Sequence, residues 1–269
     1  MTAVAARTTA SGPRLAFSGV LRSELGKLTS LRSTRIAAAS AVLLIAAGML
    51  LRAWAFAQTA ANVPVGVPGR IAWQEVLDTG LQPGRLAVVV LVALAVGSEY
   101  RDRVALSTFT AAPRRLLVLG AKAVALLVPA AVLVAGGLLV GALVSLPLMT
   151  AADLTAAPTE ILAPAASGLV VTLVVAVLAG AVTLLTRSTA AGITIVLAVL
   201  LVLPVAALLI GHVLGADLSP FVLTYAAPMA AALQDPDGAG ALARDLAVTA
   251  AWLVLPAAAA GAALVRRDV

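Results

Sequence analysis

The chain contains no cysteine and a single histidine, His212, among its 269 residues. A disulfide framework and a Cys/His metal cluster are therefore excluded. Charge is also scarce, because Asp, Glu, Lys and Arg make up 11% of the chain, against about 25% in a soluble domain. Hydrophobic residues make up 62%, the mean hydropathy is +1.10, and the composition is that of a polytopic membrane protein. The net charge of +6 then indicates orientation in a bilayer rather than a nucleic-acid partner.

Six apolar runs are long enough to cross a bilayer as helices, which takes about 20 residues each. They cover residues 36–57, 81–100, 116–148, 163–185, 190–211 and 246–265. None of them alternates apolar and polar residues as the strands of a membrane barrel do. The predicted fold is all-α. Six transmembrane helices occupy residues 36–265, between an N-terminal segment, 1–35, and a short tail, 266–269.

Two of these runs need a further assumption. The run 81–100 has a short apolar core, so Arg85 is expected to extend outward to one interface while Glu99 lies at the other. The run 116–148 is too long for one upright span. Pro129 is therefore expected to kink it or to separate an interfacial start from the span.

The basic residues favour one orientation. With a cytoplasmic N-terminus, fourteen of the eighteen basic residues lie on the cytoplasmic side, in agreement with the positive-inside rule. Eight of the twelve acids lie outside with the remaining basic residues, which are Arg52, Arg70, Arg85 and Arg244. Both termini are therefore expected in the cytoplasm, and the chain is expected in the cytoplasmic membrane.

The segment before the first span is predicted to form an amphipathic helix at residues 14–35. Its apolar residues recur with helical spacing at Phe17, Leu21, Leu25 and Leu28. Most of its basic residues lie off this stripe, where anionic headgroups attract them. The alternative is an ordinary basic flank without an interfacial role.

The same segment contains no phosphate-binding loop, although Gly26 and Lys27 superficially resemble one. Such a loop needs Ser or Thr directly after the lysine to reach magnesium, and Leu28 stands there. The chain is therefore expected to have no nucleotide site of its own.

One charged stretch, "GSEYRDRVALSTFTAAPRR", separates the second apolar run from the third and covers residues 97–115. It holds two acids, four arginines and a proline in a chain that is mostly alanine, valine and leucine. An element that transmits motion needs a rigid connection and contacts that differ between two states. Glu99 can hold this loop through Arg101 or Arg103, and Pro113 can start the next helix. The alternative is that the last two arginines only anchor a helix end.

The order of these elements resembles that of the membrane subunit of an ATP-binding cassette (ABC) transporter of the type-2 exporter superfamily. The resemblance covers the whole topology, but its recognisable residues fall in "RSELGKLTSLRSTR" and "GSEYRDRVALSTFTAAPRRLLVLGAK". They are Glu24, Lys27, Ser30, Arg32, Glu99, Tyr100, Arg101, Thr108, Pro113, Arg114, Arg115 and Lys122.

The resemblance implies a transport subunit rather than an enzyme. Such subunits pair as homodimers or heterodimers, and each half docks a cytoplasmic ABC ATPase, so that a complex holds two ATPase copies. ATP and magnesium are then bound by the ATPase, and this chain carries no cofactor and no catalytic residue. The implied cargo is an amphipathic small molecule, such as a drug, an antibiotic or a lipid, that moves outward across the cytoplasmic membrane.

The resemblance also implies which residues meet the ATPase. The coupling region comprises Glu99, Tyr100, Arg101, Asp102, Arg103, Pro113, Arg114 and Arg115. The N-terminal helix supports it through Arg22, Glu24, Lys27 and Arg32.

Two other functions stay open. An intramembrane enzyme acting on lipid-linked substrates would need polar catalytic groups close to one interface. The sequence shows no paired acids and no His/Asp set that is not explained as a flank. A membrane scaffold that recruits or senses a partner without transport is also compatible with the sequence.

Two outer segments are apolar but too short to span. Residues 71–77 include Trp73, which is expected in the interface at headgroup depth. Residues 219–233 belong to a 212–245 segment that is expected to be interfacial or re-entrant. His212 is expected to be a polar interface residue rather than a metal ligand.

Small residues recur at four-residue spacing in two spans, as Gly137 with Gly141 and as Ala176 with Gly180. Such spacing lets two helices approach closely. Packing within the chain is the simpler expectation, and a dimer interface is the alternative.

Overall fold

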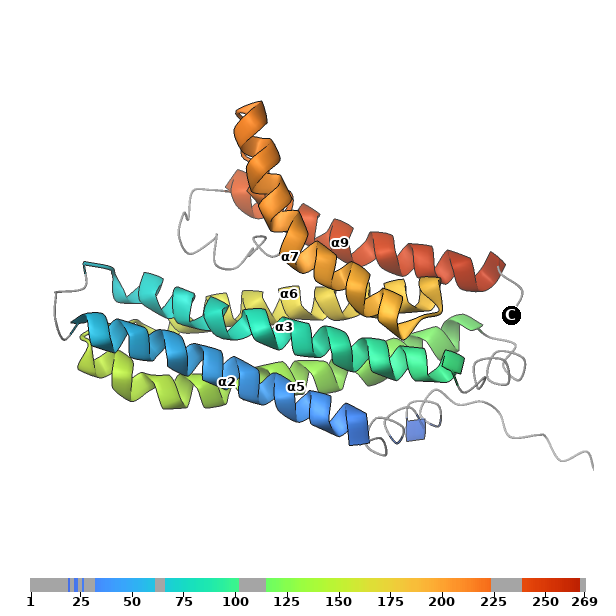
Figure 1. Ribbon diagram of the computed structural model, residues 1–269, viewed down its shortest axis with the longest axis horizontal. Coiled ribbons are helices and arrows are strands. Elements are labelled where there is room, and N and C mark those ends of the chain that lie inside the picture. The colour runs from blue at the N-terminus through green and yellow to red at the C-terminus, as the bar shows by residue number, and fades with distance from the viewer. Residues whose placement is uncertain are drawn as a thin grey trace, which may run out of the picture.

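The computed structural model describes residues 32–60, 66–101, 115–223 and 239–266, together with residues 19, 22, 23 and 26 (Figure 1). Every element in these ranges is a helix. The helices are α2 (Arg32–Ala60), α3 (Gly69–Arg101), α5 (Arg115–Ala151), α6 (Pro158–Thr186), α7 (Thr189–Leu214), the 3-10 helix η1 (Ser219–Phe221) and α9 (Ala239–Arg266). Six of them are long and apolar enough to cross a membrane. The predicted all-α, six-span fold is therefore confirmed.

The long helices give the bundle two ends of different charge. The start of α2, the end of α3, the start of α5, the end of α6, the start of α7 and the end of α9 lie together on the right in Figure 1. This end is called the basic end, and its described basic residues are Arg32, Arg35, Arg101, Arg115, Lys122, Arg187 and Arg266. The opposite half is called the acidic end. Its described acids are Glu75, Asp78, Asp153, Glu160, Asp217 and Asp245.

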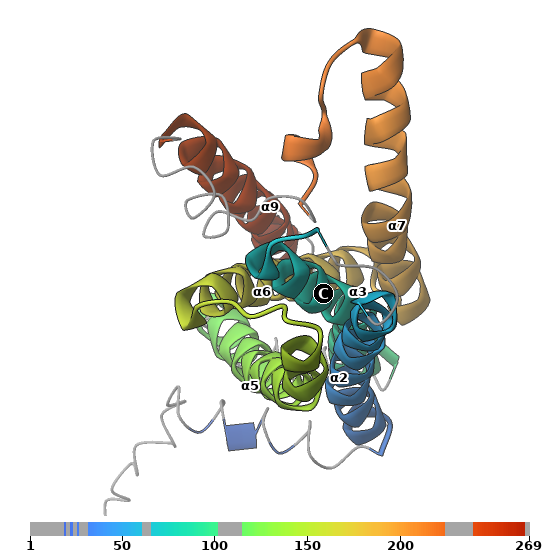
Figure 2. The same ribbon diagram turned by 90° about the vertical axis from the view of Figure 1, so that its left-hand side faces the viewer.

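Helix α3 lies at the centre of the bundle. It packs against α2, α6 and α7 and also contacts α5. Helices α3 and α6 bury the largest share of their apolar windows, and α7 and α9 bury the smallest. Figures 1 and 2 show why, since α7 and α9 diverge from the core that α2, α3, α5 and α6 form.

Two large side chains of α2 fit against glycines on both neighbouring helices. A Cβ atom at Gly137 of α5 would come within 2.9 Å of the Ile45 side chain, and one at Gly141 would overlap Met49. The same two side chains face two glycines of α3, Gly80 and Gly84. Small residues allow this close approach in a membrane, where packing drives helix association. The small-residue spacing in the third span is therefore a contact within the chain.

Residues 71–77 belong to α3 rather than to an interfacial segment. Trp73 is 2% exposed, and its indole Nε1 donates a hydrogen bond to the backbone carbonyl of Leu154 at 3.1 Å. Trp73 is therefore covered by another segment of the chain, and its position at headgroup depth stays a prediction. With 33 residues, α3 is roughly 50 Å long at about 1.5 Å per residue. Its first turns pack against the segment that follows α5, where Leu154 and Thr155 lie.

The third apolar run forms one continuous helix. Helix α5 extends from Arg115 to Ala151 with Pro129 inside it, so no break in the helix separates an interfacial start from the span, and a kink at Pro129 stays a prediction. Membrane helices tolerate internal proline because neighbouring groups and local adjustments satisfy the freed carbonyl.

The predicted N-terminal helix is described at four positions. Gly19, Arg22, Ser23 and Gly26 are helical, and Arg22 is exposed. Glu24, Lys27 and Ser30 lie outside the described residues. Arg32 is exposed and begins α2, so the first long helix starts before the predicted boundary at residue 36.

Candidate functional site

The charged stretch 97–115 begins and ends at the basic end. Glu99, Tyr100 and Arg101 form the last residues of α3, and Arg115 is the first residue of α5. The remaining predicted coupling residues, Asp102, Arg103, Pro113 and Arg114, lie outside the described residues, as does Thr108. The structure thus positions both helices that carry the stretch, and they share one end of the bundle with the start of α2 (Figure 1).

The neighbouring connection between α6 and α7 fixes the end of α3. A Cβ atom at Gly97 of α3 would overlap the Thr189 side chain at the start of α7. Thr189 is held there because Ser188 caps α7, with its hydroxyl oxygen accepting a hydrogen bond from the Ala191 amide at 3.3 Å. The last turn of α3, where Glu99 lies, therefore leaves the bundle from a closely packed position.

Arg187 is a charged residue of this end that sequence reasoning did not include in the coupling region. It is exposed and adopts a left-handed backbone with φ 53°, which terminates α6. Only Arg187 and Ser188 separate α6 from α7. In the sequence, an arginine and a serine between two apolar runs indicate a tight turn. This pattern does not reveal that the turn lies beside α3.

Arg85 occupies the middle of α3 and is buried. Its side chain is 3% exposed, and its Nε has no hydrogen-bond partner. The expectation that Arg85 extends outward to an interface is therefore wrong, because α3 is the central helix and its neighbours cover this position. Charged groups inside a membrane domain are costly, and where they persist they mark functional positions.

The nearest acid along α3 lies two turns from Arg85. Asp78 precedes it by seven residues, roughly 10 Å along a helix, and interacts with it electrostatically. Asp78 is exposed, and so is Gln82 between them. This face of α3 thus changes from exposed and polar to buried and cationic toward the bundle centre.

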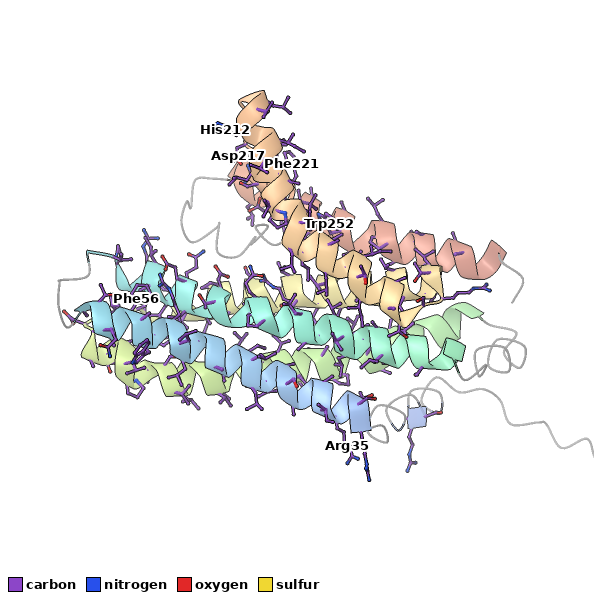
Figure 3. The ribbon with its side chains drawn as sticks, viewed as in Figure 1. Arg35, Phe56, His212, Asp217, Phe221 and Trp252 are labelled. Carbon is purple, nitrogen blue, oxygen red and sulfur yellow. The ribbon has the colours of Figure 1, made fainter. Side chains whose placement is uncertain are left out.

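At the acidic end, α2 and α3 are joined by charge. The Arg52 guanidinium donates a hydrogen bond to the Glu75 carboxylate and lies 4.3 Å from the centroid of the Phe56 ring. Figure 3 shows Phe56 at this end of α2. Both charged side chains are partly exposed, at 37% for Arg52 and 43% for Glu75.

The segment after α7 is tied to α9. Asp217 Oδ1 accepts a hydrogen bond from the Ser219 amide at 2.9 Å. The hydroxyl of Ser219 and, to a lesser extent, this amide hold the pKa of Asp217 below its usual value. Trp252 Nε1 of α9 donates to the Phe221 carbonyl at 3.2 Å (Figure 3). His212 is exposed on the last turn of α7. Within the described ranges, no group of three His, Cys, Asp or Glu side chains could hold a metal ion.

The described part of the 212–245 segment is therefore the end of α7, η1 and the start of α9. Residues 224–238 lie outside the described residues.

A cavity of about 340 Å³ opens between α3, α5, α6 and α9 near the basic end. Among the residues that the structure describes, its lining is apolar apart from one charged residue, Lys122.

Comparisons with known protein families, with characterised proteins and with solved structures return no significant match to the chain.

Proposed function

We propose that the chain is the membrane-spanning permease subunit of an ABC exporter, which moves an amphipathic small molecule outward with ATP hydrolysed by a separate subunit. The observation that carries the proposal is the convergence at the basic end. The two helices that bear the 97–115 stretch, the start of α2 and the turn at Arg187 all lie there (Figure 1). This arrangement offers a cytoplasmic ATPase a surface that is both basic and rigidly connected to the bundle.

Helix α3 supplies the mechanical link that such a subunit needs. It runs without interruption from Gly69 to Arg101, so it connects Glu99 and the buried Arg85 with Glu75, the ion-pair partner of Arg52 on α2. A displacement at the loop can thus be passed to the far end of the bundle, since a packed helix moves as a unit between discrete positions. The central position of α3 means that α2, α6 and α7 would respond to it.

The proposal assigns the chemistry to partners. Two ABC ATPase copies bind ATP and magnesium, and a second copy of this chain or a paralogue completes the permease in the cytoplasmic membrane. The chain itself supplies docking and coupling residues, with no catalytic group.

An intramembrane enzyme is the weaker candidate because three buried threonine hydroxyls of the described helices are engaged locally. Thr172, Thr183 and Thr249 each donate to the carbonyl four residues earlier in their own helix, at 2.7 Å. Such bonds are typical of structural threonines in membrane helices. The two buried hydroxyls of the described helices without a partner, those of Thr34 and Ser145, lie toward opposite ends of the bundle, on α2 and α5. A scaffold without transport is tested by the same experiment as the exporter.

That experiment is purification of the full chain from native membranes in mild detergent, with co-purifying proteins sequenced for a P-loop. A docked ATPase is expected in comparable amount. Its recovery should fall when Arg101, Arg103, Arg114 and Arg115 are replaced by alanine. The matched control is Arg70→Ala, an exposed arginine at the acidic end, which should leave recovery unchanged. The absence of any ATPase, under conditions that preserve other membrane complexes, would favour the scaffold.

A further inference from the structure

The cavity near the basic end is open space between four helices. It holds about 340 Å³, within the range of small-molecule sites, which begins at about 300 Å³. Its walls come from the last third of α3, the first third of α5 and the inner faces of α6 and α9, and include Val92, Lys122, Gly180, Leu184 and Ala260.

Two glycines line this cavity, and their role differs from that of the glycines facing α2. A Cβ atom at Gly137 or Gly141 would collide with α2, whereas one at Gly180 would lie 3.5 Å from Val92 Cγ1, an ordinary van der Waals contact. A Cβ atom at Gly120 would meet nothing within 4 Å. Gly120 and Gly180 are therefore not needed for two helices to approach closely. Because they have no side chain, they leave the cavity larger than other residues would.

The chemistry of the lining matches an amphiphile with a negative head. Lys122 is the one charged residue among the described residues that line the cavity, and it is half-buried. It lies seven residues, about two helical turns, after Arg115 at the start of α5. An ammonium group on a flexible apolar stem can stay beside an apolar chain while it binds phosphate as a point charge.

The position of the cavity favours a membrane lipid as the occupant. Helix α9 packs mainly against α6 and contacts α5 only lightly, so the side between α5 and α9 gives a chain access from the bilayer. All four helices that form the walls are apolar and long enough to span.

We propose that this cavity binds one acyl chain of an anionic phospholipid, with its phosphate at Lys122. The site does not depend on the transport function. Because the bound chain contacts both α3 and α5, it fixes the relative position of the two helices that carry the 97–115 stretch. Occupancy stabilises the folded bundle, since a ligand that binds only the folded state shifts unfolding toward higher temperature.

The test is native mass spectrometry of the full chain, titrated with phosphatidylglycerol and with phosphatidylcholine of the same acyl chains. The wild type is expected to bind the anionic lipid about tenfold more tightly, as suits one charge-assisted contact. Lys122→Ala should remove this preference and Lys122→Arg should keep it. Arg35→Ala, an exposed arginine of the same end outside the cavity, is the matched control and should change nothing.

The acyl chain is tested by filling the cavity. Gly180→Leu should reduce binding of both lipids by about tenfold or more, since a chain and a leucine cannot occupy the same space. Gly136→Leu, where the added side chain meets open space, should bind as the wild type does. Where Gly180→Leu does not fold, Ala260→Leu serves in its place. Equal binding of both lipids by the wild type, or unchanged binding after the cavity is filled, would overturn the proposal.

Discussion

Arg52 of α2 and Glu75 of α3 form an ion pair at the acidic end, and the same guanidinium lies 4.3 Å from the Phe56 ring centroid. The charge of Arg52 thereby links α2 to α3. Its cation–π contact is made within α2, to Phe56 one turn further along. Because both charged groups are partly exposed, the ion pair is expected to contribute less than about 1 kcal/mol.

A double-mutant cycle measures this ion pair. Arg52→Met and Glu75→Gln, made singly and together, are expected to show a coupling energy of about 0.5 kcal/mol in unfolding experiments, decreasing at high salt. Phe56→Leu in the Glu75→Gln background isolates the ring contact, at about 0.5–1 kcal/mol. A coupling energy above about 3 kcal/mol would instead mean that the ion pair is shielded from solvent.

The glycines of α5 that face α2 are expected to be intolerant of larger residues. Gly137→Val should lower the free energy of unfolding by about 1–3 kcal/mol, because the added carbons meet Ile45. Gly136→Val, one residue away and directed into open space, should leave stability unchanged or raise it slightly, since valine is the better helix former. Thermal unfolding of both variants in the same detergent checks the pair. Equal effects would show that α2 and α5 do not pack as described.

The buried Arg85 is expected to lower the stability of the chain while it contributes to its function. Arg85→Met should unfold at the same temperature as the wild type or above it, because it removes a buried guanidinium whose Nε lacks a partner. If the chain works as proposed, substrate-stimulated ATP hydrolysis by the complex should fall at least about tenfold. Gln82→Met, an exposed position one turn away, is the control for both measurements. Normal hydrolysis in a stabilised Arg85→Met variant would show that the buried charge is not part of the mechanism.

Glu99 is expected to act in coupling rather than in stability. If the chain works as proposed, Glu99→Ala should leave ATPase co-purification intact and abolish the stimulation of ATP hydrolysis by substrate, because the residue lies in the last turn of α3, the helix that connects loop and bundle. Glu160→Gln is the control at the acidic end, where Glu160 Oε2 accepts from the Ala157 amide at 2.8 Å. If substrate stimulates ATP hydrolysis in Glu99→Ala as strongly as in the wild type, Glu99 does not act in coupling.

The number and location of the helices could be predicted because length and hydropathy constrain a membrane span strongly. The separation of charge between the two ends followed from the same pattern, since alternating spans bring every second loop together. The close contact at Gly137 and Gly141 could also be predicted, because glycines at four-residue spacing in a span usually mark a place where two helices approach closely. These features depend on local sequence alone.

The surroundings of Arg85 and Trp73 could not be predicted in this way. The sequence of α3 alone is compatible with either residue at a membrane interface. Both are buried because α3 is the central helix of the fold. Its first turns are polar enough to resemble a loop, although Leu154 from a distant segment covers Trp73. The proximity of Arg187 to α3 likewise depends on the contact of Thr189 with Gly97, which joins segments far apart in the chain.

The turn at Arg187 and Ser188 holds the first turns of α7 directly, whereas its other end is linked to α9 through η1, by the hydrogen bond of Trp252 to Phe221. The first turns of α7 are held by Gly97 and by the cap at Ser188, whereas Leu208, Leu209 and Val213 near its other end are exposed. A rotation of α7 about this closely packed start is magnified along the helix. A spectroscopic label at the far end of α7 would therefore record such a rotation as a larger displacement than a label at its start.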